Sequence, residues 1–193
     1  MAEWEPSHVP LLAHPDFPGE GVRRVLACAA PAGPDSLRLQ YVLEADLRRL
    51  RIPQAMAGAG RADELWAHTC FEAFIGTARA PGYLELNFSP SGQWAAYRFD
   101  SYRRGMTAAA DVAPRLALRR TGKELELQAE VPASVIASCE EPRLRIALSA
   151  VVEDLEGRLS YWALRHPPGR PDFHHPESFS LVLELHTPSQ NPV

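Results

Sequence analysis

The segment from Trp162 to Pro176 is the richest in side chains that could contact a ligand. It contains His166, Asp172, His174 and His175 and is interrupted by prolines. Strands are predicted on both sides of it, and a loop of this length in a compact domain is usually functional or disordered. Prolines lower the entropy of the unfolded chain and favour an ordered loop. We predict that it forms a wall of a binding site; the alternative is a stiff connector packed on the domain.

The same residues raise the possibility of a metal site. Imidazole and carboxylate groups suit zinc and similar ions, and His68, His166, Asp172 and His174 are the candidate ligands. Their spacing matches no known metal signature, and the side chains of His174 and His175 would point to opposite sides of an extended chain. We therefore predict no bound metal and keep a metal-dependent enzyme or metalloprotein as an alternative.

A second segment, residues 65–75, places a carboxylate among apolar residues. If this segment is extended, Glu72 shares a face with Cys70 and Phe74. A buried carboxylate needs a partner, so Glu72 is either a structural anchor or a ligand contact. Trp66 and His68 open the segment on one face. Trp66 is either a platform for the apolar face of a sugar ring or a core residue.

A third segment, residues 83–102, carries a polar stripe on one strand face. The stripe consists of Tyr83, Glu85, Asn87 and Ser89. Such a stripe either faces solvent or, beside aromatic rings, recognises hydroxyl groups. Farther along the segment, Tyr97 could contact a ligand, and Arg98, like Arg165, could pair with an anionic group.

Catalytic signatures are weak in this sequence. It contains no GxSxG nucleophile elbow, no phosphate-binding GxxxxGK[ST], no GxGxxG and no HExxH. His68 and Cys70 would share one strand face at a spacing too wide for an ideal ion pair. We therefore predict a binding protein rather than an enzyme.

Alternation of apolar and polar residues predicts the elements that position these groups. It recurs over residues 37–45, 83–89, 93–99, 116–118, 125–131, 144–152, 159–163 and 179–185. Short helical turns are expected at 107–111 and 134–139. About ten short strands joined by Gly and Pro turns predict an all-β, immunoglobulin-like antiparallel sandwich.

Length and composition agree with one globular domain. The 193 residues are 46% hydrophobic and 23% charged, and the formal net charge is −4. We predict a single domain over residues 1–193, with its core at about 20–186. The negative charge argues against nucleic acid, and no apolar run is long enough to span a bilayer.

Cysteine usage and the first residues predict a location. Cys28, Cys70 and Cys139 form no CxxC pair, so we expect reduced and mostly buried thiols. The first residues lack the pattern of a signal peptide. Together these features predict a cytoplasmic protein.

Taken together, the three segments resemble bacterial DOMON-like proteins, which are related to family 9 carbohydrate-binding modules. The motifs are LWAHTCFEAF from Leu65, YLELNFSPSGQWAAYRF from Tyr83, and YWAL from Tyr161 followed by HPPGRPDFHHP from His166. The resemblance runs from about Leu37 to Leu185. It implies an immunoglobulin-like sandwich that binds sugars by aromatic stacking and by amide and carboxylate hydrogen bonds. By motif, Glu72, Asn87 and Gly92 match family positions.

Other DOMON domains hold haem, with Met and His as axial ligands. Met56 and Met106 lie in weakly patterned segments, so we predict no cofactor.

The leading prediction is a non-catalytic domain that binds a saccharide or sugar derivative, and the alternatives are the metalloprotein and a protein-interaction module. The predicted ligand-binding residues are Trp66, His68, Glu72, Asn87, Tyr97, Arg98, Trp162, His166, Asp172, His174 and His175.

Overall fold

The computed structural model describes residues 7–33, 36–132 and 143–184, and these residues fold almost entirely into β-strands. The strands are β1 (Val9–Ala13), β2 (Val22–Pro31), β3 (Ser36–Ala45), β4 (Cys70–Gly76), β5 (Tyr83–Phe88), β6 (Trp94–Phe99), β7 (Thr107–Ala108), β8 (Arg115–Arg120), β9 (Glu124–Pro132), β10 (Arg143–Glu153), β11 (Leu159–Ala163) and β12 (Leu181–Glu184). Three short 3-10 helices connect them: η1 (Leu47–Arg49), η2 (Leu65–Ala67) and η3 (Pro176–Ser178). None of the helices in these ranges is long and apolar enough to cross a membrane.

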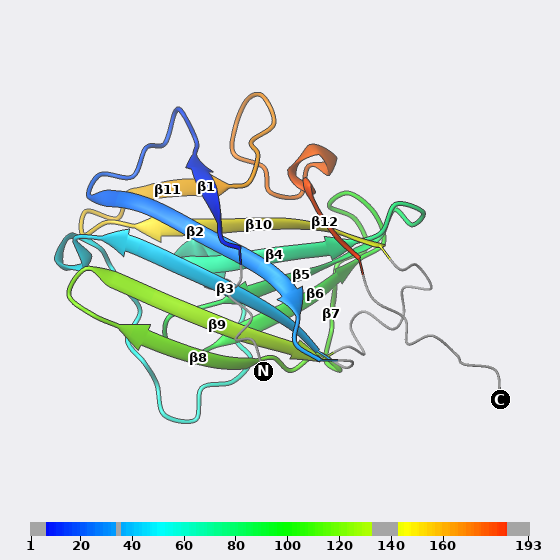
Figure 1. Cartoon of the computed structure of the whole chain (residues 1–193), viewed down its shortest axis with the longest axis horizontal. Helices are drawn as coiled ribbons and strands as arrows, with labels where there is room; N and C mark the ends of the chain where they lie inside the picture. The colour runs from blue at the N-terminus through cyan, green and yellow to red at the C-terminus, as the bar shows by residue number, and fades with distance from the viewer. Residues whose placement is uncertain (1–6, 34–35, 133–142, 185–193) are drawn as a thin grey trace.

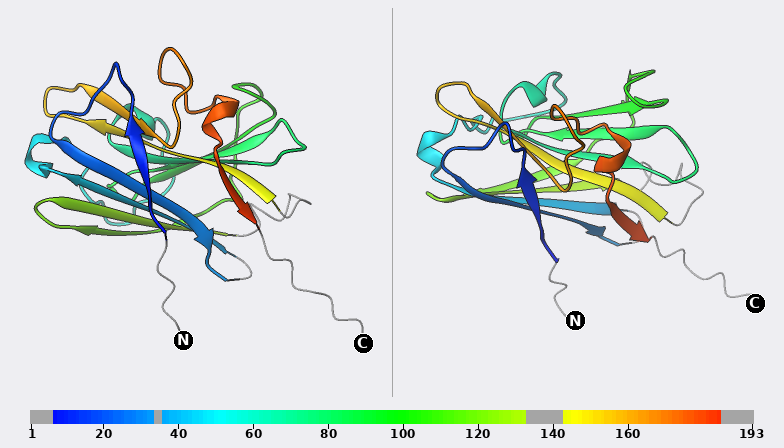
Figure 2. Two further views of the ribbon diagram at one scale, coloured as in Figure 1. Left: turned by 45° about the horizontal axis from the view of Figure 1, so that its top comes forward. Right: turned by 90° about the horizontal axis from the view of Figure 1, so that it is seen from above.

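The strands form an antiparallel β-sandwich. One layer, here called the front sheet, has the order β1-β2-β3-β9-β8; the other, the back sheet, has the order β7-β6-β5-β4-β10-β11-β1, with β12 also paired to β10. Figure 1 shows the front sheet nearer the viewer, and the right-hand view of Figure 2 shows the two layers one above the other. The predicted sandwich is therefore confirmed, with 12 strands rather than about ten.

Strand β1 connects the two layers. Its first half, Val9 to Leu11, pairs with β2, whereas Leu12 and Ala13 pair with β11. The chain thus passes from one sheet to the other within five residues. Leu11 is 3% exposed in the core, and the neighbouring Leu12 is 57% exposed on the opposite face of the strand.

Alternating side chains fill the space between the sheets. On the front sheet, β3 alternates strictly between buried and half-buried residues, with Leu37, Leu39, Tyr41 and Leu43 fully buried. On the back sheet, Phe71, Leu86 and Leu148 belong to the same core cluster. This is the period-2 pattern that the sequence predicts.

The back sheet also has an apolar outer face, which is unusual for the outer side of a sandwich. Phe74, Tyr83, Tyr97, Val151 and Ala163 form a second cluster there. Loops cover part of this face, so strands β4 and β5 are buried on both sides.

The pairing of β10 explains why a loop lies over this face. Along one edge, β10 pairs with β12 over Arg143–Ile146 and then with β11 over Ser149–Glu153. The chain between β11 and β12 therefore leaves the sheet, and it is the orange loop in Figure 1. His14 Nε2 hydrogen-bonds to the Gly169 carbonyl oxygen at 2.9 Å and ties this loop to the end of β1.

Several sequence expectations need correction. Strands β1 and β2 were not predicted, and β1 lies before residue 20, so the packed core begins earlier than expected. Residues 107–108 form strand β7 rather than a helical turn. The expected turn at 134–139, and Cys139 with it, lie outside the described residues. Cys28 and Cys70 are free and buried, as predicted.

Candidate functional site

A cavity of about 960 Å³ opens on the outer face of the back sheet. Strands supply its floor through Glu72, Glu85, Tyr97, Phe99, Val151 and Tyr161. The loop before β4 supplies Arg61, Asp63 and Trp66, the turn after β6 supplies Arg103 and Met106, and the loop after β11 supplies Pro171, Phe173 and His174. The cavity thus joins strands β4, β5, β6, β10 and β11 with three loops, in the arrangement typical of ligand sites: apolar walls with a few convergent polar groups.

Strand register places two carboxylates side by side on the floor. Glu72 of β4 lies opposite Asn87 of β5, and Glu85 lies two residues before Asn87. Glu72 and Glu85 are therefore diagonal neighbours on one face, roughly 7–8 Å apart between Cα atoms by general sheet geometry. They are only 3% and 6% exposed.

The two carboxylates differ in their partners. Asn87 Nδ2 donates a hydrogen bond to Glu85 Oε1 at 2.8 Å. Within the described part of the chain, nothing donates a hydrogen bond to the Glu72 carboxylate; only its backbone carbonyl accepts one, from the Tyr41 hydroxyl at 2.6 Å. Burial, followed by repulsion from Glu85, raises the pKa of Glu72 well above its usual value. Burial also raises the pKa of Glu85.

His174 faces these carboxylates from the loop above. Its Nδ1 lies 2.8 Å from the Tyr83 hydroxyl, and that hydroxyl also accepts from the backbone N–H of Arg103. The tautomer of the ring sets which of Nδ1 and the Tyr83 hydroxyl is the donor. The other ring nitrogen, Nε2, lies 3.7 Å from Glu85 Oε2. Burial and then Arg103 lower the pKa of His174 to about 4, so the ring is neutral near pH 7.

Asp172 holds the loop against the turn after β6. Its carboxylate accepts hydrogen bonds from the Tyr102 hydroxyl, from Arg103 Nη2 at 2.8 Å and from the His174 backbone N–H at 3.1 Å. These donors lower the pKa of Asp172 against the opposing effect of burial. Asp172 itself does not line the cavity; it positions Arg103 and His174, which do.

The rim is aromatic and polar. Trp66, on helix η2, is 51% exposed and lines the cavity. The Tyr97 hydroxyl donates to Asp63 Oδ1 at 2.6 Å, which raises the pKa of Tyr97, already raised by burial, to about 12. The Arg61 guanidinium pairs with Asp63 at 2.8 Å and lies 5.5 Å from the centre of the Tyr97 ring.

The structure brings together about half of the predicted site residues. Trp66, Glu72, Tyr97 and His174 line the cavity. Asn87 is fully buried beside Glu72 and hydrogen-bonds to Glu85. Asp172 does not line the cavity, but it contacts Arg103 and His174, which do. These six predicted residues therefore lie in or next to the cavity.

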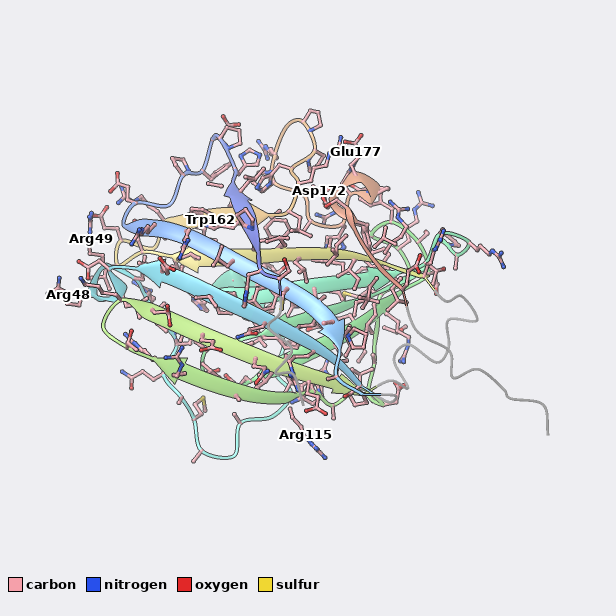
Figure 3. All side chains as sticks on the ribbon, viewed as in Figure 1. Arg48, Arg49, Arg115, Trp162, Asp172 and Glu177 are labelled. Atoms are coloured by element: carbon pink, nitrogen blue, oxygen red, sulfur yellow. The ribbon has the colours of Figure 1, made fainter. Side chains whose placement is uncertain are left out.

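Two predicted residues lie on the wrong side of their strand. Trp162 is 7% exposed and packs between the sheets, where its Nε1 donates to Ser160 Oγ at 3.0 Å. It is a core residue and offers no platform to a ligand in this cavity; Figure 3 labels it on β11, apart from Asp172 in the loop. Arg98 alternates with Tyr97, faces away from the cavity and pairs with Asp111 at 2.6 Å. Arg165, the other expected anion partner, pairs with Glu177.

The three remaining histidines have structural partners elsewhere. His68 Nδ1 lies 2.8 Å from Glu153 Oε2. His166 Nε2 lies 2.9 Å from the Leu12 carbonyl oxygen, which can only accept, so the ring donates there and anchors the loop to β1. His175 caps η3 by accepting from the Glu177 backbone N–H. None of the three lines the cavity.

These positions disagree with the metal alternative. The candidate ligands have different partners in different places, and the described residues contain no group of three or more His, Cys, Asp or Glu side chains that could hold a metal ion.

Sequence reasoning missed several residues of the cavity. The predicted site includes Asn87 but omits Glu85. Both residues belong to the same polar stripe, so the alternation places them on the same face of the strand. Arg103 is also not among the predicted site residues; in the sequence it stands beside Arg104 with no motif around it. Its φ of 54° is an unusual turn conformation for a residue other than glycine, and no local pattern in the sequence shows that its guanidinium meets Asp172.

Two other cavities at the surface of the described residues have no pair of buried carboxylates like Glu72 and Glu85. One, of about 540 Å³, lies beside the turn between β10 and β11, where Arg158 pairs with Asp154 and Glu20. The other, of about 1000 Å³, lies at one end of the front sheet, where Glu44 pairs with Arg24. Their charges are paired at the surface, so the back-sheet cavity is the better candidate.

Comparison with known proteins identifies the fold only. No protein-family model matches the chain, and no curated protein matches it in sequence. Among solved structures, a "putative carbohydrate-binding protein" from Bacteroides uniformis aligns over 94% of this chain and 87% of its own, with a TM-score of 0.70 and 16% identity. At this identity the likeness shows a shared fold.

Weaker matches are two structures of a family 9 carbohydrate-binding module from Caldicellulosiruptor kristjanssonii. One is in complex with glucose and one with cellotriose, and each has a TM-score of 0.49 and 12% identity over 88% of this chain. They cover 80% and 78% of the modules.

Proposed function

We propose that this chain is a non-catalytic domain that binds a saccharide or sugar derivative in the back-sheet cavity. The observation that carries the proposal is the Glu72 carboxylate, which is 3% exposed, lines a cavity of about 960 Å³ and receives no hydrogen bond from the described residues. A buried charged group without a partner is costly, and donors from a ligand would remove that cost.

The other groups of the cavity suit a sugar. Trp66 and Tyr97 present aromatic surface near the opening, and such rings pack against the apolar face of a pyranose. Carboxylate oxygens of Glu72 and Glu85 accept from hydroxyl groups, while Arg103 donates to them. A neighbour that shares the fold, from Bacteroides uniformis, is named for carbohydrate binding, which supports the same class of ligand here.

A binding role agrees better with these groups than catalysis by a cysteine. Burial raises the pKa of the Cys70 thiol well above its usual value, so this thiol is a poor nucleophile. The DOMON-like assignment rests on the sequence motifs and a cytoplasmic location on the cysteine usage, and both are proposals.

The test is a titration of intrinsic tryptophan fluorescence with mono- and disaccharides. We expect a saturable change that Trp66→Ala abolishes and that Trp162→Phe retains, because Trp66 lines the cavity and Trp162 does not. No response from folded protein to any saccharide, checked by calorimetry, would overturn the proposal.

A further inference from the structure

We propose that the ligand carries a cationic amine, as an amino sugar does, and that its ammonium group binds between the carboxylates of Glu72 and Glu85. The inference rests on the proposed function and narrows its ligand class. The inference follows from the charged side chains that line the cavity: some of them form ion pairs within the protein, and others do not.

Charges on the rim of the cavity are paired within the protein. Arg61 forms an ion pair with Asp63 at 2.8 Å. Arg103 forms one with Asp172 at 2.8 Å, and its side chain is 51% exposed. Both guanidinium groups that line the cavity are therefore engaged by carboxylates other than the two on the floor.

The carboxylates on the floor have no such partner. Among the described residues, Glu72 forms no ion pair, and the nearest basic group to Glu85 is His174 at 3.7 Å. His174 is neutral near pH 7, because burial lowers its pKa to about 4. Among the described residues, neither acidic group on the floor forms an ion pair with a permanently charged side chain, and Arg103, which is paired with Asp172, acts on both only from a longer distance.

An ammonium group complements this pair better than a hydroxyl group. It supplies three donors and a positive charge, whereas each hydroxyl supplies one donor and leaves the carboxylates uncompensated. Hydrogen bonds between ions are also stronger than those between neutral groups. The rings of Tyr97, Tyr161 and Phe173 line the same space, and aromatic faces attract cations.

Burial makes the acidic pair easier to protonate when the cavity is empty. Burial, with mutual repulsion at Glu72, raises the pKa values of both carboxyl groups, while Arg103 lowers them. An ammonium group favours the ionised forms, so its binding releases protons, and its affinity rises with pH from about 4.5 through the raised pKa values. The titratable or charged groups packed around Glu72 and Glu85 in the described residues are Tyr41, Cys70, Tyr83, Tyr97, Tyr161, Arg103 and His174.

The test compares matched sugars by isothermal titration calorimetry at pH 7. Glucosamine and galactosamine are compared with glucose, galactose and N-acetylglucosamine, in which the nitrogen carries no charge. We expect the amino sugars to bind about tenfold more tightly or better. Repeating the titration in buffers of different ionisation enthalpy would show proton release with the amino sugars only.

Two variants locate the effect. Glu72→Gln and Glu85→Gln keep the shape of the side chains and remove one charge each, so each should abolish most of the preference for amino sugars. Glu156→Gln, at an exposed position in the turn between β10 and β11, removes the same charge away from the cavity and should retain the preference.

The outcomes separate this inference from the proposed function. If neutral sugars bind as tightly as amino sugars, or if both glutamine variants keep the preference, the inference is wrong and saccharide binding stands. If no sugar of either kind binds to folded protein, both are wrong.

Discussion

At the scale of single residues, the two tryptophans predicted to contact a ligand lie in opposite environments. Trp66 is 51% exposed at the cavity, and Trp162 is 7% exposed between the sheets. The same residue type therefore lines the cavity in one place and packs in the core in the other.

Substitution should separate these roles. Trp66→Ala should weaken sugar binding about tenfold and change the free energy of unfolding by less than about 0.5 kcal/mol, as expected for a surface position. Trp162→Ala should lower the free energy of unfolding by about 3–5 kcal/mol, because it leaves a cavity in the core. Urea denaturation measures both; equal destabilisation by the two variants would contradict the assignment.

At the scale of elements, the loop after β11 owes its position to contacts at its two sides. His14 and His166 tie it to β1, and Asp172 ties it to the turn after β6. Since Arg103 and His174 line the cavity, the geometry of the site depends on these contacts.

Removing the Asp172 carboxylate should loosen this loop without unfolding the sheets. In Asp172→Ala, the His174 amide loses its acceptor, so its hydrogen exchange should accelerate while that of β4 and β5 stays slow. Sugar affinity should fall severalfold. Glu177→Ala, at an exposed ion pair in the same segment, is the control; a similar effect from it would argue against a specific role of Asp172.

Strand β1 offers a test of how the two sheets are joined. Leu11 and Leu12 are neighbours with 3% and 57% exposure. Leu11→Ala should cost about 2–5 kcal/mol of unfolding free energy, and Leu12→Ala less than about 0.5 kcal/mol. Equal costs, measured by chemical denaturation, would mean that β1 does not pack as described.

At the scale of the whole molecule, the acidic floor makes stability depend on pH. The pKa of Glu72 is raised in the folded state, so the folded protein binds more protons than the unfolded chain above about pH 4.5, and stability falls as pH rises through the raised pKa. His174 acts in the opposite sense: its pKa of about 4 makes stability fall as pH drops below about 6.5.

A difference measurement isolates the effect of Glu72. Glu72→Gln should be more stable than the wild type by an amount that grows as pH rises from about 4.5 through the raised pKa of Glu72, since both proteins retain His174. Thermal or urea unfolding across this range checks it. A stability difference independent of pH would show that Glu72 ionises normally in the folded state.

The sequence by itself determined the strands with regular alternation and the faces of their residues. In β3, β5, β9 and β10 the pattern matches the structure, and Glu72, Cys70 and Phe74 share a face as predicted. Strand β2 escaped prediction because its alanines and paired arginines alternate poorly. Successive side chains of a strand point to opposite faces wherever the strand lies in the fold. The faces can therefore be predicted from the local sequence.

Only the tertiary structure decided which face of the back sheet carries the site. Alternation says that Tyr161 and Trp162 point to opposite sides, but both sides of this sheet are apolar, so the pattern cannot tell core from cavity. The pairing of Arg103 with Asp172 and the meeting of Glu72, Glu85 and His174 join segments distant in sequence. Their contacts depend on strand order and on the path of the loop after β11, which no local pattern encodes.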